Sequence, residues 1–229
     1  MRVDGLLFDK DGTLFDFGLT WNSFAKGMIA KFAEGDAHLA SRIAGELDFD
    51  LATGSFLPQS AIIAGTNRDA AEAVGRALPD RDIAELENTL MYAASEAPLS
   101  EAVPLAGFLD DLSGRGLRLG VMTNDTEYAA RAHLKSVGVE ERFDLILGFD
   151  SGFGAKPDPG PLLAFSERFT LSPDRVAMVG DSTHDLIAGQ RAGMQTIAVL
   201  TGMATEAELA PYADVVFPNI GHIPGWLAA

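Results

Sequence analysis

The chain has 229 residues, of which 47% are hydrophobic, so it is long enough to bury an extensive core in one large domain or two smaller ones. Its formal net charge of −16 argues against nucleic acid as a partner, because such binding depends on clustered lysine and arginine, and it has the wrong sign for an anionic membrane surface. The absence of cysteine excludes a disulfide framework and thiol catalysis.

The N-terminal residues contain no apolar stretch of the length that a secretory signal needs, and no run in the sequence reaches the length of a membrane span. We therefore expect a cytoplasmic protein that acts without a membrane and without nucleic acid. The sequence leaves the oligomeric state open between a monomer and a homodimer.

The N-terminal stretch joins an apolar run at residues 6–8 to the acidic turn Asp-Lys-Asp-Gly-Thr at residues 9–13. A continuous apolar run is typical of a strand covered on both faces, as in a parallel sheet. Because side chains alternate along a strand, we expect Asp9 and Asp11 to point one way and Lys10 the other. Two neighbouring carboxylates repel each other, so the pattern favours a hard cation between them.

The next buried strand is expected only at residues 117–122, although a parallel crossover needs no more than a dozen or so residues. The intervening residues 17–96 carry Ala-rich segments with Gly and Pro between them, which predicts a helical insertion. The connectors at residues 16–18 and 97–99 are predicted hinges. The expected helices are residues 22–32, 38–47, 67–77 and 80–94.

From residue 104 onward, helical and strand patterns alternate. This alternation predicts right-handed βαβ units and an α/β fold with a doubly wound, Rossmann-like parallel sheet. The expected strands after the insertion are residues 117–122, 145–147, 176–179, 196–200 and 215–217, and the expected helices are residues 105–113, 126–137, 161–169 and 184–192.

Polar residues follow four of the predicted strands. In open parallel α/β sheets, ligands bind at the carboxyl ends of the strands, so these residues are expected to converge on one site. They are Asp9 and Asp11, Thr123, the loop at 148–156, and Asp181 with Asp185.

The order and type of these residues resemble the four motifs of the haloacid dehalogenase-like hydrolase superfamily. The run Phe-Asp-Lys-Asp-Gly-Thr-Leu at residues 8–14 is similar to its first motif, DxDGT. Thr123 in Val-Met-Thr-Asn-Asp resembles the second motif, and Lys156 in Gly-Ala-Lys-Pro resembles the third. The run Gly-Asp-Ser-Thr-His-Asp at residues 180–185 resembles the fourth.

The resemblance covers the whole chain outside the insertion. It implies an α/β catalytic core made of residues 1–16 and 97–229. Residues 17–96, inserted between the first and second motifs, resemble the C1-type helical cap of the family, which closes over the active site.

The resemblance also implies a role for each matched residue. Asp9 is the expected nucleophile, which would take up the phosphoryl group as an aspartyl phosphate, and Asp11 the expected general acid and base. Thr123 and Lys156 are expected to bind the phosphate, and Asn124 to contact the substrate or to position the phosphate-binding loop. Family members that cleave carbon–halogen bonds lack the aspartate found here at position 11.

The expected cofactor is Mg²⁺, which prefers carboxylate oxygens and keeps several waters. The resemblance implies that Asp9 and Asp181 bind it, together with the backbone carbonyl of Asp11. Asp185 is expected to be an outer ligand.

The insertion is expected to read the organic part of the substrate. The turn at residues 53–56 and the segment 60–68 carry polar and aromatic side chains that could meet a small organic group. Lys26, Arg42 and Arg68 are candidates for binding a carboxylate on it.

The resemblance thus implies a Mg²⁺-dependent phosphatase, similar to phosphoglycolate phosphatases and other capped phosphatases, that hydrolyses a small phosphorylated metabolite. One alternative is a phosphomutase similar to β-phosphoglucomutases, although those relatives often replace the threonine found here as Thr13. Another is a non-catalytic phosphate-binding protein, whose usual mark is a lost nucleophile or metal ligand.

Overall fold

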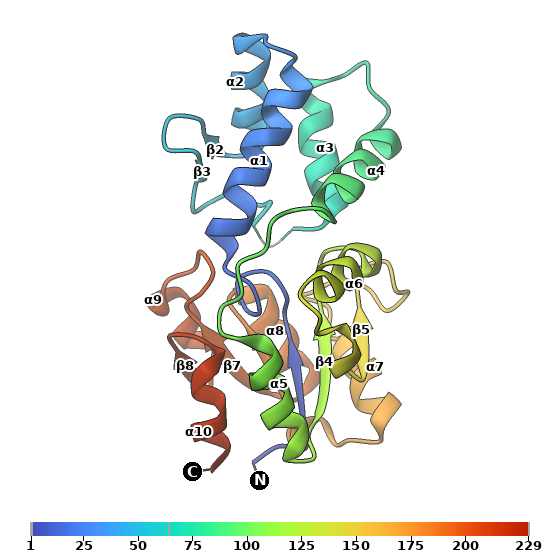
Figure 1. Cartoon of the computed structure of the whole chain (residues 1–229), viewed down its shortest axis with the longest axis vertical. Helices are drawn as coiled ribbons and strands as arrows, with labels where there is room; N and C mark the ends of the chain where they lie inside the picture. Colours follow the sequence, from blue (N-terminus) through green and yellow to red (C-terminus); the bar gives the residue numbers. More distant parts are fainter. Residues whose placement is uncertain (1, 64, 229) are drawn as a thin grey trace.

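The computed structural model describes residues 2–63 and 65–228. Six parallel strands form the sheet of the lower body in Figure 1, in the order β5-β4-β1-β6-β7-β8. This arrangement confirms the predicted α/β fold with a doubly wound parallel sheet. The strands are β1 (Gly5–Phe8), β4 (Arg118–Met122), β5 (Leu145–Leu147), β6 (Val176–Gly180), β7 (Gln195–Val199) and β8 (Val215–Phe217).

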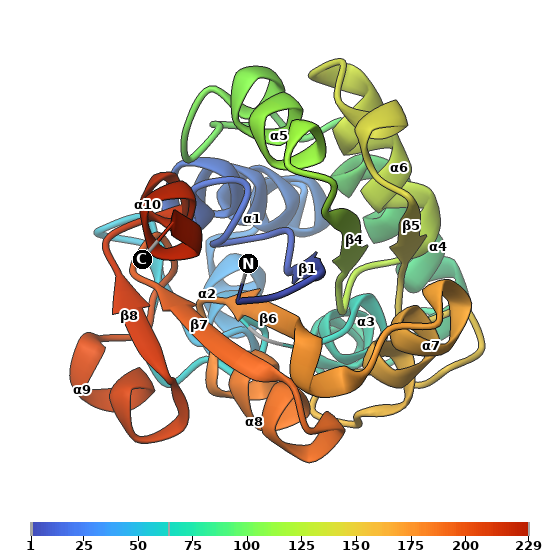
Figure 2. The same ribbon diagram turned by 90° about the horizontal axis from the view of Figure 1, so that it is seen from below.

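Helices cover both faces of the sheet, as the view from below in Figure 2 shows. Leu6 and Phe8 of β1 pack into the hydrophobic layer on one face, whereas Leu7 packs into the layer on the other. The strand is therefore buried on both sides, which explains its continuous apolar run. The first face is covered by α5 (Leu105–Gly114), α6 (Glu127–Ser136) and α10 (Ile223–Ala228), and the second by α7 (Gly160–Phe169) and α8 (Thr183–Ala192).

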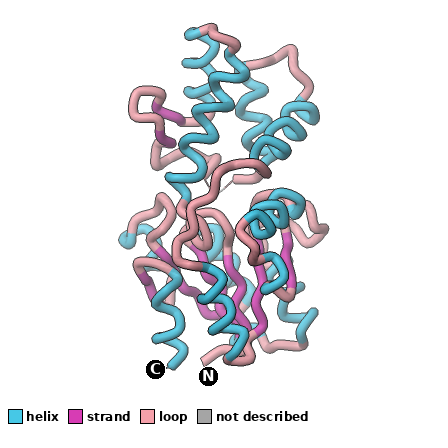
Figure 3. The backbone as a smooth tube through the Cα atoms, in the orientation of Figure 1, coloured by secondary structure: helices cyan, strands magenta, loops and turns pink. Residues whose placement is uncertain are grey.

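The residues between β1 and α5 form a second, mainly helical body with a hydrophobic core of its own. It lies beyond the carboxyl ends of the strands, at the top of Figures 1 and 3. No helix in the described part of the chain is long and apolar enough to cross a membrane. The elements of this body are α1 (Phe17–Ala33), α2 (Ala37–Glu46), α3 (Asn67–Ala77), α4 (Ile83–Ala94) and the antiparallel hairpin of β2 (Phe49–Asp50) and β3 (Ser55–Phe56).

The two chain segments that connect the bodies run side by side. The backbone N–H of Asp16 donates to the carbonyl of Ser100 at 2.8 Å, and the N–H of Ala102 donates to the carbonyl of Leu14 at 2.9 Å. The two crossings are thus tied to each other by backbone hydrogen bonds at the base of the helical body.

Several element boundaries differ from the prediction. The first helix begins at Phe17 rather than at residue 22, because the Asp16 carboxylate caps it by accepting from the N–H of Leu19. Two of the three residues of the connector predicted at residues 16–18 are therefore helical, and their role as a hinge stays a prediction. The fourth helix likewise begins later than predicted, after its cap Asp82. The β2–β3 hairpin, α10 and the short helix α9 (Glu206–Leu209) were not predicted.

Candidate active site

The residues that follow the strands lie together at the carboxyl edge of the sheet. Asp9 follows β1, Thr123 follows β4 and Asp181 follows β6, while Lys156 lies in the loop before α7 and Asp185 in the first turn of α8. All five line one cavity, with a volume of about 140 Å³, which extends between the sheet and the helical body. The expected convergence of the strand ends is therefore present.

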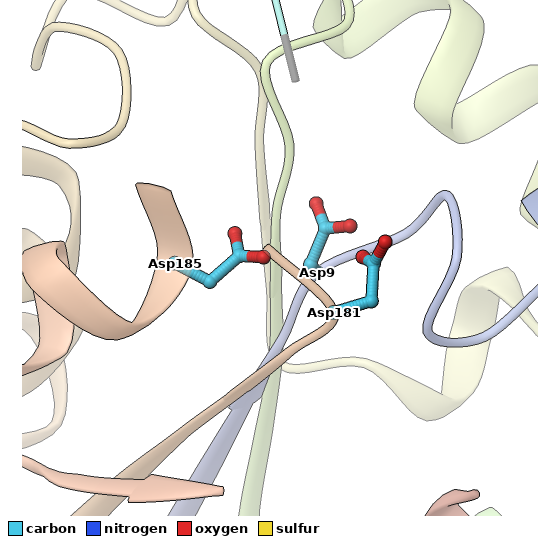
Figure 4. A group of neighbouring side chains, drawn as sticks. All are labelled: Asp9, Asp181 and Asp185. Atoms are coloured by element: carbon cyan, nitrogen blue, oxygen red, sulfur yellow. The ribbon is translucent and has the colours of Figure 1, made fainter. Parts of the chain in front are cut away.

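Three carboxylates form the floor of this cavity. Asp9, Asp181 and Asp185 are buried, and their nearest oxygen atoms all lie within 4.8 Å of one another. Figure 4 shows the three side chains, two on loops that continue strands and one on the helix that follows. Burial raises the pKa of Asp9 to about 7, partly opposed by Lys156. Burial, and then repulsion from Asp9 and Asp185, also raises the pKa of Asp181.

This donor set fits Mg²⁺. Buried carboxylate oxygens that repel one another are stabilised by a divalent cation, and hard oxygen ligands are the ones Mg²⁺ prefers. The Asp181 carboxylate packs directly against two glycines, where any larger residue would collide with it. A Cβ on Gly202 would lie 1.7 Å from Asp181 Oδ2, and a Cβ on Gly12, whose φ is +84°, would lie 2.2 Å from the same atom.

Asp185 is held by the start of its own helix. Its Oδ2 accepts hydrogen bonds from the N–H of Ser182 at 3.0 Å and from the Ser182 hydroxyl at 2.7 Å, as part of a capping box. Ser182 is the N-cap of α8. The other oxygen, Oδ1, lies 2.6 Å from Lys156 Nζ.

Lys156 bridges two of the carboxylates. Its Nζ lies 2.5 Å from Asp9 Oδ1 as well as contacting Asp185, and it donates to the carbonyl of Met122 at 2.8 Å. Burial alone would lower the pKa of Lys156, but Asp185 and Asp9 together raise it, so the side chain stays charged. The Asn124 side chain holds the backbone of Lys156 with two hydrogen bonds: it donates to the Lys156 carbonyl and accepts from the Lys156 N–H, both at 2.9 Å.

The Asp11 carboxylate lies apart from this group. Its Oδ2 is 2.5 Å from Lys10 Nζ, and its Oδ1 accepts a hydrogen bond from the indole Nε1 of Trp21 at 2.8 Å. The expectation that Lys10 would point away from Asp11 is wrong, because β1 ends at Phe8 and the chain then turns, so strand alternation does not extend to these residues. The predicted contact of the Asp11 backbone carbonyl with the metal stays a prediction.

Lys10 connects Asp11 to the rest of the molecule. It is fully buried, lies 3.3 Å from Asp125 Oδ2 and donates to His133 Nδ1 at 3.0 Å. His133 Nε2 in turn donates to the carbonyl of Ala94 at 2.6 Å, at the last residue of α4. A chain of polar contacts therefore runs from Asp11 through the core to the helical body.

Sequence reasoning missed four of these residues. Asp125 is the last residue of the run Val-Met-Thr-Asn-Asp that resembles the second motif, and this position is the one signal that the sequence offers for it. Trp21 lies inside the predicted insertion, His133 lies in the middle of a helix, and Gly202 follows a strand. Nothing in the sequence links any of these three to Asp11 or Asp181, because the contacts join segments that are distant in the chain.

The basic residues proposed to bind a carboxylate do not line the cavity. Arg42 donates to the carbonyl of Ala77, and Arg68 pairs with Glu72 and Glu87. Lys26 is exposed on α1. The segment at 60–68 does contribute to the lining, through the side chains of Ile62, Ile63, Thr66 and Asn67.

Comparison with known proteins places the chain in a family. A phosphoglycolate phosphatase from Rhodospirillum rubrum is 33% identical over 167 residues, which cover 69% of this chain and 68% of that protein. An N-acetylmuramic acid 6-phosphate phosphatase from Pseudomonas putida is 30% identical over 208 residues, which cover 88% of this chain and 85% of that protein.

The fold of the chain also matches a solved structure, and its sequence matches a family model. A solved structure described as a haloacid dehalogenase-like hydrolase from Bacteroides fragilis matches with a TM-score of 0.72 and 20% identity, covering 97% of this chain and all of that one. The model of the haloacid dehalogenase-like hydrolase family matches residues 57–199. The chain therefore belongs to the haloacid dehalogenase-like hydrolase family.

Proposed function

We propose that the protein is a Mg²⁺-dependent phosphatase that hydrolyses a small phosphomonoester through an aspartyl phosphate on Asp9. Its membership of the hydrolase family and its relatives named as phosphatases support phosphatase activity. The observation that carries the proposal is the position of Lys156, whose Nζ contacts Asp9 and Asp185 beside a third buried carboxylate. An anionic phosphate can enter an acidic site of this kind only where cations reverse the local field.

In the first step, a carboxylate oxygen of Asp9 forms a bond to phosphorus, and the bond between phosphorus and the leaving oxygen breaks. Asp11 donates a proton to that leaving oxygen, which departs as an alcohol. In the second step, a water gives its proton to Asp11 and attacks phosphorus, the bond to Asp9 breaks, and inorganic phosphate is released. The two steps return both carboxylates to their starting state.

The phosphate-binding residues have separate tasks in this proposal. Lys156 balances negative charge on the transferring group, and its position is fixed by the side chain of Asn124. The Thr123 hydroxyl accepts from the N–H of Asp125 at 3.1 Å and keeps its own proton to donate to a phosphate oxygen. Mg²⁺ held by Asp9, Asp181 and Asp185 would neutralise charge that develops on the phosphoryl oxygens.

We also propose that residues 17–96 act as a cap on a core of residues 1–16 and 97–229. The helical body has its own hydrophobic core, and the two crossings lie together, as a hinge requires. Such a cap would exclude water from the phosphoryl transfer and contact the leaving group.

Phosphate release with and without Mg²⁺ tests the proposal, with Asp9→Asn as the inactive variant and Asp80→Asn, at an exposed position, as its matched control. We expect Asp9→Asn to keep its circular dichroism spectrum and to lose turnover by several orders of magnitude, and Asp80→Asn to behave as the wild type. A phosphorylated peptide that contains Asp9, trapped by acid quenching, would identify the intermediate. Near-normal turnover by Asp9→Asn would refute the nucleophile.

A further inference from the structure

The active-site cavity continues into the helical body, and its wall there is mainly apolar, with Thr66 and Asn67 as polar members. Trp21, Phe24, Met28 and Phe32 follow one another on α1 at spacings of three and four residues, and all four line the cavity. Ile62 and Ile63, in the loop between β3 and α3, also contribute to the wall. The part of a substrate that extends beyond the phosphate would therefore contact hydrocarbon and aromatic surface.

This wall offers no counter-ion for an acidic group. Among the described residues that line the cavity, Lys156 is the single lysine or arginine, and its Nζ already contacts Asp9 and Asp185. His184 also lines the cavity, but it lies on α8 beside the sheet and not in the helical body. The three basic side chains of the helical body that the sequence suggests for binding a carboxylate, Lys26, Arg42 and Arg68, are all exposed and do not line the cavity.

The carboxylates at the floor of the cavity make binding of a substrate with a second anionic group, in addition to its phosphate, still less favourable. A carboxylate on the leaving group would lose its hydration against apolar side chains without an ion pair in return. It would also lie near the carboxylates of Asp9, Asp11 and Asp181, of which the first and the last are buried. An alkyl group or ring in the same place would instead be stabilised by the removal of its apolar surface from water.

We infer that the substrate is a phosphomonoester of a small apolar alcohol, with a short alkyl chain or a single ring, rather than one that carries a carboxylate. The cavity volume of about 140 Å³ must also hold the phosphate, so it limits the organic part to a short chain or a single ring, since an apolar cavity of roughly 150 Å³ accommodates benzene. The inference rests on the proposed phosphatase function. It departs from the phosphoglycolate-like substrate expected from the sequence, because glycolate is itself a carboxylate.

Matched substrates test the inference. Butyl phosphate and 4-(phosphonooxy)butanoate are primary alkyl esters of the same chain length that differ in their terminal group. We expect kcat/KM for butyl phosphate to exceed that for the carboxylate ester by at least tenfold, and to exceed that for methyl phosphate. Equal values for the pair, or a preference for the carboxylate, would overturn the inference.

Acetyl phosphate separates this inference from the function on which it rests, because its leaving group is small and reactive. Hydrolysis of acetyl phosphate without a preference for butyl phosphate would overturn the apolar class while leaving the phosphatase function in place. Release of phosphate from none of these compounds would overturn both. Calorimetric binding of butylphosphonate and 4-phosphonobutanoate gives a readout without turnover, and we expect the first to bind at least tenfold more tightly.

A cation placed in the wall should reverse the preference. We expect Phe24→Lys, at a half-buried lining position, to raise the ratio of kcat/KM for the carboxylate ester to that for butyl phosphate by at least tenfold. Leu19→Lys adds the same charge on the same helix at a residue that is 67% exposed and lies outside the lining, and it should leave the ratio unchanged. Ile63→Lys repeats the test from another element if Phe24→Lys does not fold. An unchanged ratio in a folded lining variant would contradict the inference.

Discussion

His133 provides a test of the buried polar contacts that join the two bodies. Its ring is fully buried, with Nδ1 accepting from Lys10 and Nε2 donating to the carbonyl of Ala94. Because Lys10 is charged and donates to Nδ1, this geometry requires the neutral ring with its proton on Nε2. A second proton on Nδ1 would face the ammonium group of Lys10 directly.

The effect of this geometry on stability follows from the pKa. Burial, followed by the charge of Lys10, lowers the pKa of His133 from 6.5 to about 4. Between these values the unfolded chain binds a proton that the folded chain does not, so the free energy of unfolding falls as the pH falls. The whole shift corresponds to about 3 kcal/mol, of which about 2 kcal/mol develops between pH 7.5 and pH 5.

Urea unfolding at pH 7.5 and pH 5 measures this contribution when the wild type is compared with His133→Gln, whose amide does not titrate. Other buried groups titrate in both proteins, so the comparison uses the difference between them. We expect the loss of stability on acidification to be smaller in His133→Gln by about 2 kcal/mol. His38→Gln, at an exposed histidine, should match the wild type. Equal losses in the wild type and His133→Gln would refute the reasoning.

Three further predictions concern the acid/base and metal residues. Trp21→Phe removes the indole donor from Asp11 but keeps a ring in the cavity, so kcat should fall by about tenfold in steady-state assays while Trp226→Phe has no effect. Gly202→Ala places a Cβ against Asp181 and should raise the Mg²⁺ concentration for half-maximal activity by about tenfold, whereas Gly107→Ala, which meets open space, should not. A chelator should abolish activity in the wild type, and added Mg²⁺ should restore it there but not in Asp181→Ala at the same concentration.

The core of the fold could be predicted because its signals are local. Each strand of the sheet carries its own apolar run, and polar N-caps mark several of the helices. The β2–β3 hairpin escaped prediction because each strand has only two residues, too few for a period to be seen. The start of α1 differs from the prediction because the sequence pattern assigns Asp16 to a connector, whereas its side chain caps the helix.

The residues of the candidate site also differ in whether local sequence signals predict their positions. Residues directly after a strand, such as Asp9 and Asp181, could be placed because the end of a strand fixes where the next residue lies. The side-chain direction of Asp11 could not be placed, since it depends on a turn and on two partners, Lys10 and Trp21, of which one is in the other body. Long-range pairs such as Lys10 with His133 leave no periodic signal in either segment.

The apolar face of α1 shows why chemistry is easier to infer from sequence than substrate. Apolar residues at spacings of three and four predict that a helix face is covered, but they do not say whether another helix or a ligand covers it. Here one face of α1 contributes to both the core and the cavity, since Ile29 is buried in the core of the helical body and also lines the cavity, and Trp21, half-buried, lines the cavity and donates to Asp11. The same helix therefore contributes to the stability of the helical body, to the shape of the space for the leaving group and to the position of the proposed general acid.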